Sequence, residues 1–186
     1  MAGSILGDFV RGGIEDRFPP AIEDAIRLHR EIDDFTDHNL HWMQSRSRLS
    51  EPRRRYAGVI VDVFYDHLLC RRWDELAEAP LDRFIARSYR ALARHLQHYD
   101  GKGREVVGWL IEEDWLSRYP SCEGLARTFV GLSRRTARSG VMLGSEEELF
   151  ADLEAYESDF AKFWPELEAF VAEARRSMAA ARSGSD

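Results

Sequence analysis

The sequence predicts an all-α protein, a single helical domain of about seven or eight helices. Apolar residues recur at helical spacing along most of the chain, whereas the alternation typical of a strand never persists beyond a few residues. Six prolines and few β-branched runs also favour helices over a sheet. Val59–Phe64 alone could form a buried strand, but it lies in a longer helix-compatible run and has no partner strand.

The size and charge of the chain limit its organisation and its partners. With 186 residues it is long enough for one domain with a substantial core. We place a single helical domain at residues 1–181 and expect Arg182–Asp186 to form a disordered tail. The formal net charge of −7 argues against a nucleic-acid partner recruited by bulk charge.

Nothing in the chain predicts export or a membrane partner. No apolar run approaches the roughly 18 residues of a membrane span, and the first residues lack the pattern of a signal peptide. Cys70 and Cys122 lie inside apolar helical patterns and lack the spacing of metal ligands. Two isolated thiols fit a reducing compartment, so we expect a soluble, cytoplasmic protein.

Glycines and prolines divide the first half of the chain into helices. Gly12-Gly13 ends the first helix, and Pro19-Pro20 begins the second because proline is favoured in a first helical turn. Thr36–Asn39 has the polar residues of a turn or cap. The helices expected in this half are Ser4–Arg11, Pro20–Phe35, a short helix ending near Arg48, and Ser50–Trp73.

The second half is predicted to contain amphipathic helices of similar length. A capping box of Ser145 and Glu148 begins one of them, and Pro165 breaks or kinks the last helical pattern. Asp100–Gly103 is predicted to form a turn. The helices expected here are Pro80–Tyr99, Val106–Tyr119, Ser121 to about Gly140, Glu146–Trp164, and a last helix to about Ala181.

The central helix, Val59–Trp73, carries charge where a core helix should be apolar. Most of its residues are apolar or aromatic, and the main exceptions before its basic end are Asp62, Asp66 and His67. Asp62 and Asp66 share one face at i, i+4, while His67 points about 100° away from Asp66. A carboxylate in a core is costly unless a metal, a cation or a dense set of hydrogen bonds neutralises it.

A second predicted helix carries a polar pair on an apolar stripe. His29 and Asp33 are one turn apart and lie within about 40° of Ile22 on a helical wheel, and Asp8 and Asp37 can join them from neighbouring turns. Carboxylates and imidazoles together suit divalent manganese, magnesium, iron or zinc. Such an ion lowers the pKa of a bound water and polarises a phosphoryl oxygen.

Each of these side chains also has a purely structural alternative. The carboxylates can pair with neighbouring arginines, and His29 can be a hydrogen-bonded histidine of the core. A metal or catalytic site is favoured by the coincidence of several acidic and imidazole groups on apolar faces of two helices.

Five segments of the chain carry a family pattern beyond this spacing. They are Leu6–Gly12, Phe18–Asn39, Arg54–Trp73, Asp114–Tyr119 and Phe163–Val171. In consistent order, and over almost the whole chain, they resemble the acyl carrier protein phosphodiesterase family, also called acyl carrier protein hydrolase. Members of that family usually carry more residues before the first segment, including a histidine, whereas Met1 lies five residues before Leu6 here. A late start and a missing piece of the first helix both fit this difference.

The resemblance implies an all-helical fold related to the HD-type metal-dependent phosphohydrolases. It implies hydrolysis of the phosphodiester that links 4′-phosphopantetheine to a serine of holo-acyl carrier protein, with Mn²⁺ as the metal, or another divalent ion such as Mg²⁺ or Fe²⁺. Asp8, His29, Asp33, Asp62, Asp66 and His67 fall at the acidic and histidine positions of the family motifs; of these, we expect His29, Asp33 and Asp66 to hold the metal, with Asp8 or Asp62 as a further ligand. The residues expected to be catalytic are Asp62, Asp66 and His67.

Arginine supplies the positive charge that this substrate requires. Arg11 and Arg30 are the candidates for binding the phosphate. An acidic carrier protein also needs a local basic patch on this acidic chain. The candidates for that patch are Arg53, Arg54, Arg55, Arg71 and Arg72, with Arg46 and Arg48 nearby.

Two other functions fit the same residues. One is a different helical metal phosphohydrolase, acting on nucleotides or small phosphoesters. The other is a helical protein that binds carrier protein without turnover.

Overall fold

A computed structural model describes residues 12–15, 18–99, 101–134 and 138–183. These residues are helical and contain no strand, which confirms the all-α fold class. The predicted helix Ser4–Arg11, and with it Asp8 and Arg11, lies outside the described residues. None of the described helices is long and apolar enough to span a membrane.

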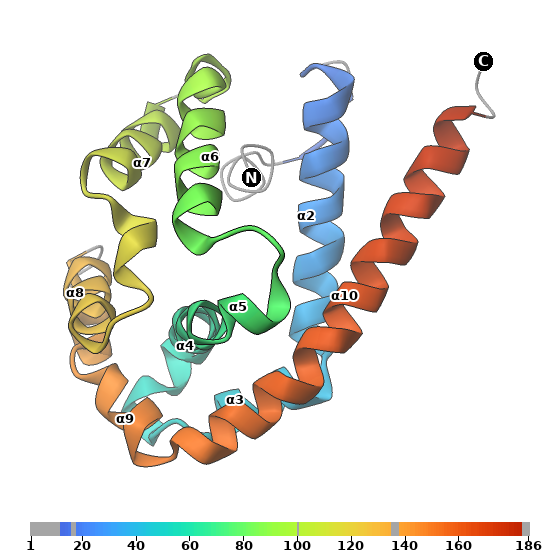
Figure 1. The fold of residues 1–186 in the computed structure, drawn as a ribbon. Coiled ribbons are helices and arrows are strands. Elements are labelled where there is room, and N and C mark those ends of the chain that lie inside the picture. The colour runs from blue at the N-terminus through green and yellow to red at the C-terminus, as the bar shows by residue number, and fades with distance from the viewer. Residues whose placement is uncertain (1–11, 16–17, 100, 135–137, 184–186) are drawn as a thin grey trace.

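The helices lie around α4, which is near the middle of the molecule (Figure 1). The α-helices are α2 (Pro20–His38), α3 (Leu40–Arg48), α4 (Ala57–Arg71), α5 (Trp73–Leu76), α6 (Leu81–Arg94), α7 (Gly101–Glu112), α8 (Cys122–Ser133), α9 (Ser145–Ala151) and α10 (Leu153–Ser183). Short 3₁₀-helices connect them: η1 (Glu51–Tyr56), η2 (Leu96–His98), η3 (Trp115–Arg118) and η4 (Ser139–Met142). The described residues therefore hold nine α-helices, against the seven or eight predicted.

The extra elements arise because some predicted helices are split. The predicted Ser50–Trp73 helix begins as the 3₁₀-helix η1 before α4. The predicted Val106–Tyr119 helix ends at Glu112, because Asp114 adopts a left-handed backbone with φ of 45°. The predicted turn at Asp100–Gly103 is wrong from Gly101 onward, where α7 already begins.

The capping box predicted at Ser145 does not form. Gly144, with φ of 72°, is the N-cap of α9, and Ser145 is already helical. Glu148 instead accepts hydrogen bonds from the backbone N–H and the hydroxyl of Ser50, at 2.9 and 2.6 Å, and from Arg53. Partners distant in sequence therefore replace the local cap and tie α9 to η1.

Helix α10 continues through Pro165, so of the two predicted outcomes, a break or a kink, the break does not occur. Pro165 has no N–H to donate, and Figure 1 shows the helix changing direction along its length. Its end extends to Ser183, two residues into the predicted tail, where Arg182 pairs with Asp24 at 3.0 Å. Residues 184–186 lie outside the described residues.

Two hydrophobic clusters form the interior. The larger one surrounds the buried face of α4, which includes Ile60, Phe64 and Leu68. The smaller one joins Ile22 and Ile26 of α2 to residues of α6, α7 and the segment before α2. Helix α2 therefore packs into the smaller cluster through its first turns and reaches the larger one later in its course.

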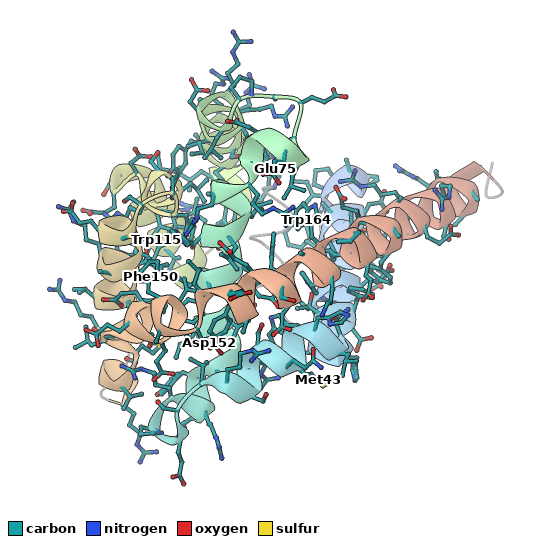
Figure 2. All side chains as sticks on the ribbon, turned by 60° about the horizontal axis from the view of Figure 1, so that its bottom comes forward. Met43, Glu75, Trp115, Phe150, Asp152 and Trp164 are labelled. Atoms are coloured by element: carbon teal, nitrogen blue, oxygen red, sulfur yellow. The ribbon has the colours of Figure 1, made fainter. Side chains whose placement is uncertain are left out.

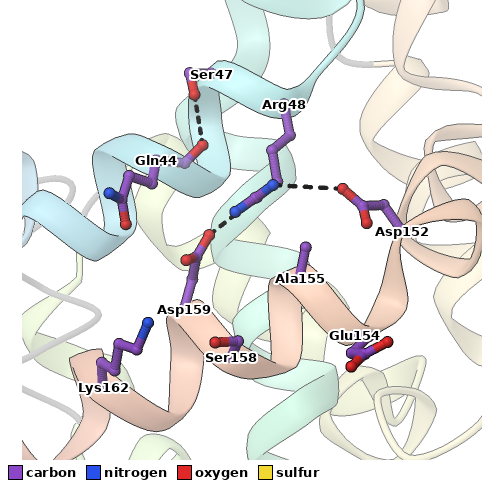
Figure 3. A pocket seen from close by; sticks show the side chains of 9 residues that line it. All are labelled: Gln44, Ser47, Arg48, Asp152, Glu154, Ala155, Ser158, Asp159 and Lys162. Atoms are coloured by element: carbon purple, nitrogen blue, oxygen red, sulfur yellow. Dashed lines mark hydrogen bonds and ion pairs between the residues drawn. The ribbon is translucent and has the colours of Figure 1, made fainter.

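A buried charge holds α3 against α10, which lies across it (Figure 2). Asp159 of α10 is only 3% exposed and accepts hydrogen bonds from Arg48 Nε at 3.0 Å and from Ser45 Oγ at 3.1 Å. Ser45 also hydrogen-bonds the hydroxyl of Tyr65 at 3.0 Å. Asp152 contacts the other side of the same guanidinium at 3.5 Å (Figure 3). This network fixes α3 between α10 and α4.

Candidate functional site

A cavity of about 690 Å³ opens between α2, α4 and α10. It has an acidic side, formed by α2 and α4, and an apolar side, formed mainly by α10. The residues that line it are His29, Ile32, Asp33, Thr36, Asp37, Trp42, Gly58, Val59, Asp62, Tyr65, Asp66, Leu69, Phe160, Phe163, Trp164 and Leu167. The two polar pairs predicted on separate helices thus meet at one cavity.

Asp62 lies one turn before Asp66 on the cavity face of α4. Its side chain is open to the cavity, yet the surrounding protein desolvates it and raises its pKa to about 6. The indole Nε1 of Trp42 donates a hydrogen bond to Asp62 Oδ1 at 3.3 Å, which lowers the pKa in part. Asp33 and Asp37 repel the carboxylate and raise the pKa further.

Asp66 is the more strongly perturbed carboxyl group. Burial and the nearby charge of Asp62 raise its pKa to about 7. A hydrogen bond with the Tyr119 hydroxyl acts in the opposite direction. That hydroxyl also accepts a hydrogen bond from the indole of Trp115 at 3.0 Å. Tyr119 therefore positions Asp66 through its hydroxyl group.

The α2 side of the cavity carries an imidazole–carboxylate pair. His29 Nε2 lies 3.2 Å from Asp33 Oδ2, at the i, i+4 spacing of a helix face. The His29 side chain is 16% exposed and that of Asp33 is 57% exposed, so the pair lies at the rim rather than in the core. Asp37, one turn further along α2, extends this acidic rim.

The donor types around the cavity fit a divalent cation. Neither Asp62 nor Asp66 has an ion-pair partner within the part of the chain that the structure describes, and desolvation by burial, together with repulsion between acidic groups, raises the pKa of both. Oxygen donors with one imidazole are suited to Mn²⁺, Mg²⁺ or Fe²⁺. No three His, Cys, Asp or Glu residues among those described form a ready-made metal-binding group. Asp8, the fourth predicted ligand, lies outside the described residues.

The structure separates His67 from the cavity. It is 1% exposed, and its Nδ1 lies 2.7 Å from the carbonyl oxygen of Tyr119, to which it donates. Its ring meets the edge of Phe150 at 5.9 Å between centroids, and burial lowers its pKa. Asp66 lines the cavity, whereas His67, the next residue of α4 and about 100° away around the helix, is not among the lining residues. The predicted catalytic role of His67 has no support in this placement.

The predicted phosphate-binding arginines do not line the cavity in the described residues. Arg30 donates to the carbonyl oxygen of Gly12 at 3.0 Å and is not among the lining residues. Arg11 lies outside the described residues. The described cation that acts electrostatically on the acidic side is Arg46, which lowers the pKa of Asp62.

Three arginines of the predicted partner-binding patch are held by intramolecular ion pairs. Arg53 pairs with Glu148 and donates to the carbonyl of Leu143 at 2.7 Å. Arg71 lies 3.6 Å from Glu157. Arg72 lies 3.0 Å from Glu75. Arg54 and Arg55 are exposed, and no described residue forms an ion pair with either.

Sequence reasoning missed two residues that support the acidic side. Trp42 donates to Asp62, but nothing in its local pattern distinguishes it from an ordinary core tryptophan. Tyr119 contacts two adjacent residues of α4. Its hydroxyl hydrogen-bonds Asp66, and its backbone carbonyl oxygen accepts from His67. The signal for Tyr119 was present, because it ends the Asp114–Tyr119 segment that carries the family pattern.

Comparison with known proteins gives one consistent family. Residues 1–167 match the family model described as acyl carrier protein phosphodiesterase. A protein of that name from Photorhabdus laumondii is 32% identical over 166 residues, which cover 88% of this chain and 82% of the relative. Proteins of the same name from Escherichia coli O139:H28 and Shigella boydii serotype 18 are each 31% identical over 168 residues, covering 90% of this chain and 87% of the relative. No solved structure matches the chain, so its relation to HD-type hydrolases stays a prediction.

Proposed function

The chain belongs to the acyl carrier protein phosphodiesterase family, and from this we propose that it hydrolyses the phosphodiester between 4′-phosphopantetheine and a serine of holo-acyl carrier protein. The products are apo-carrier protein and 4′-phosphopantetheine. The observation that carries the proposal is the cavity itself, where His29, Asp33, Asp62 and Asp66 meet from two helices. These are residues of the two segments on which the family pattern depends most.

We propose that a divalent ion, Mn²⁺ in the first instance, is held by Asp62 and Asp66 from α4 and by His29 and Asp33 from α2, with Asp8 as a further ligand. When bound, such an ion activates water and polarises the phosphoryl group. The charges of Asp62 and Asp66 support this assignment, because the protein desolvates both groups and brings no ion-pair partner to either within the described residues.

Hydrogen bonds from other side chains orient the carboxylates of Asp62 and Asp66. Trp42 fixes one oxygen of Asp62, and Tyr119 fixes Asp66. Partners of this kind set the direction of a ligating carboxylate.

The apolar side of the cavity gives the flexible arm of the substrate a place to lie. Phe160, Phe163, Trp164 and Leu167 project from successive turns of α10. Apolar walls of this kind bind the methylene and gem-dimethyl parts of a pantetheine chain and exclude bulk water from the reacting phosphate. The acidic side then faces the phosphodiester at one end of the arm.

Intact-protein mass measurement tests the proposal directly. Holo-acyl carrier protein incubated with the wild-type protein and Mn²⁺ is expected to lose the mass of the phosphopantetheine group. Asp66→Asn is expected to lower the rate by at least ~10³-fold, because it removes a charged group from the reacting centre. Glu168→Gln removes a similar charge from the exposed face of α10 and serves as the matched control.

A mass that stays unchanged with metal-loaded wild-type protein would contradict the proposal. Cleavage of free small phosphodiesters, with no preference for carrier protein, would instead assign the chain to another phosphohydrolase activity. Tight binding of holo-carrier protein without any mass change would assign it a binding role.

A further inference from the structure

A second, shallower groove lies on the outer surface of α3 and η1. It has a volume of about 350 Å³ and is lined by Met43, Arg46, Ser47, Arg54 and Ala57. We name these residues the docking groove, and we include Leu40, on the same face of α3 as Met43, and Arg55, which follows Arg54 in η1. Figure 2 shows Met43 on the side of α3 that faces away from α10.

The docking groove combines exposed apolar side chains with uncompensated positive charge. Leu40 is 59% exposed and Met43 is 42% exposed, and with Ser47 they share one face of α3 at i, i+3, i+7 spacing. Arg54 and Arg55 are exposed and have no ion pair in the described part of the chain. The neighbouring arginines Arg48, Arg53, Arg71 and Arg72 are by contrast all paired.

Trp42 forms the wall between the docking groove and the acidic cavity. The guanidinium carbon of Arg46 lies 4.6 Å from the centroid of the Trp42 ring, a cation–π arrangement on the groove side. On the cavity side the same indole donates to Asp62. The start of α4 also borders both, because Ala57 lines the groove while Gly58 and Val59 line the cavity. The groove therefore leads directly to the mouth of the cavity.

We infer that the docking groove binds the acidic face of the carrier protein around its modified serine. The inference rests on the proposed function, since it names the docking surface for that substrate. The scissile phosphodiester is attached to the serine itself, so the carrier protein must lie against the rim of the cavity and cannot reach it by means of its flexible arm. Arg54 and Arg55 then face carboxylates of the carrier protein, and Leu40 and Met43 cover its apolar side chains.

Charge alone does not single out this surface, because α6 carries a second basic stripe. Arg83, Arg87, Arg90 and Arg94 are all exposed and share one face of α6. None of these four forms an ion pair with a described residue, and none lines the cavity. A carrier protein bound along α6 would hold its serine away from His29, Asp33, Asp62 and Asp66. The stripe is therefore the matched control for the docking groove.

The test measures binding of fluorescently labelled apo-carrier protein to the full-length protein, at low and at high salt. The variant R54E/R55E is expected to raise Kd by ~10-fold or more at low salt and to flatten the salt dependence. The control R83E/R87E makes the same change in net charge and is expected to leave Kd within about 2-fold. Met43→Ser is expected to weaken binding without changing the salt dependence, because it removes apolar contact only.

Two results would overturn the inference. One is equal weakening by R54E/R55E and R83E/R87E, which would show that only overall charge matters. The other is an unchanged Kd for R54E/R55E at low salt, with circular dichroism confirming that the variant is folded. Apo-carrier protein has no bond to cleave, so the binding result stands apart from the activity. A wild-type protein that binds at this groove but cleaves nothing would refute the proposed function and leave the docking surface in place.

Discussion

At the scale of single residues, Asp66 is a group whose ionisation opposes folding. Its pKa in the folded protein is about 7, against an ordinary value of 3.8, so the folded state binds the proton more tightly than the unfolded state does. The free energy of unfolding therefore falls as pH rises through the window from about 4 to about 7. Such a carboxylate is kept for something other than stability.

Asp66→Asn is accordingly expected to stabilise the metal-free protein at pH 8, by about 2 kcal/mol or more, and to have little effect near pH 4. Denaturant unfolding in the presence of a chelator measures both values. Glu168→Gln, on an exposed face of α10, should change neither. A variant that is less stable than the wild type at pH 8 would show that hydrogen bonds, rather than burial and repulsion, dominate at Asp66.

Asp159 is the opposite case, a buried carboxylate with a full set of partners. Asp159→Ala leaves Arg48 and Ser45 without their main acceptor, so the free energy of unfolding is expected to fall by about 2–4 kcal/mol. Asp152→Ala removes the other carboxylate beside the same guanidinium, at 3.5 Å and 55% exposed, and should cost less than about 1 kcal/mol. Equal losses from the two variants would mean that burial does not decide the strength of this network.

At the scale of elements, a close backbone contact places Tyr119. A Cβ added to Gly124 of α8 would lie 1.9 Å from the carbonyl oxygen of Arg118, the last residue of η3. Real Cβ atoms do not approach that closely, so any side chain here must push η3 away from α8. Tyr119 follows directly and would move with it. The glycine thus acts on the candidate site through its effect on packing.

Gly124→Ala is expected to destabilise the fold by about 3 kcal/mol or more and to lower activity in the part that stays folded. Thermal unfolding and activity at a permissive temperature measure the two effects. In α7, Gly108→Ala is the control, because a Cβ there meets nothing within 4 Å. That control should stabilise the protein by up to about 1 kcal/mol through helix propensity. A Gly124→Ala protein with unchanged thermal stability and activity would contradict the packing described for η3 and α8.

The helical spacing of apolar residues predicted most of the helices, because it shows which face of each segment prefers to be buried. It placed the end of α3 and the start of α8 well, including the cap at Ser121, whose hydroxyl accepts from Gly124 N–H at 3.0 Å, but α8 ends at Ser133 rather than near Gly140. It failed where a distant partner decides the conformation. Glu148 binds Ser50 and Arg53 rather than capping α9, and Cys122, expected in an apolar face, is exposed at the first turn of α8.

The same limit applies to the candidate site. The residues on the apolar faces of α2 and α4 were identified from sequence, because a charge in an apolar stripe is visible in the sequence. Their hydrogen-bond partners were not, because Trp42 and Tyr119 are distant in sequence from the residues that they position. His67 was included because it is a polar residue of an otherwise apolar helix and lies in the Arg54–Trp73 motif, but its contact with the Tyr119 carbonyl holds it away from the cavity lining.

At the scale of the whole molecule, the proposed metal would join two parts of the interior. Helix α2 begins in the smaller hydrophobic cluster, and α4 is the centre of the larger one. His29 and Asp33 extend from the former toward Asp62 and Asp66 on the latter. An ion held by both pairs therefore stabilises the packing of α2 against the rest of the protein.

Mn²⁺ at about 100 times its Kd is expected to add about 2.7 kcal/mol to the free energy of unfolding. For a chain of this size that corresponds to a rise in Tm of about 5–10 °C. Differential scanning fluorimetry with and without Mn²⁺ measures the rise, which should be lost in Asp62→Asn and Asp66→Asn and kept in Glu168→Gln. A rise that survives in both aspartate variants would place the ion elsewhere.

Trp42 makes the docking groove and the acidic cavity parts of one binding equilibrium. Its ring carries Arg46 on the groove side and its indole N–H binds Asp62 on the cavity side. If the proposed docking drew Arg46 toward the carrier protein, the ring on which it lies would shift, and the hydrogen bond to Asp62 would shift with it. Thermodynamic linkage then requires reciprocity: whatever factor docking adds to affinity in the cavity, occupation of the cavity adds to docking. After cleavage that mutual gain is lost on both sides at once, which favours release of the two products together.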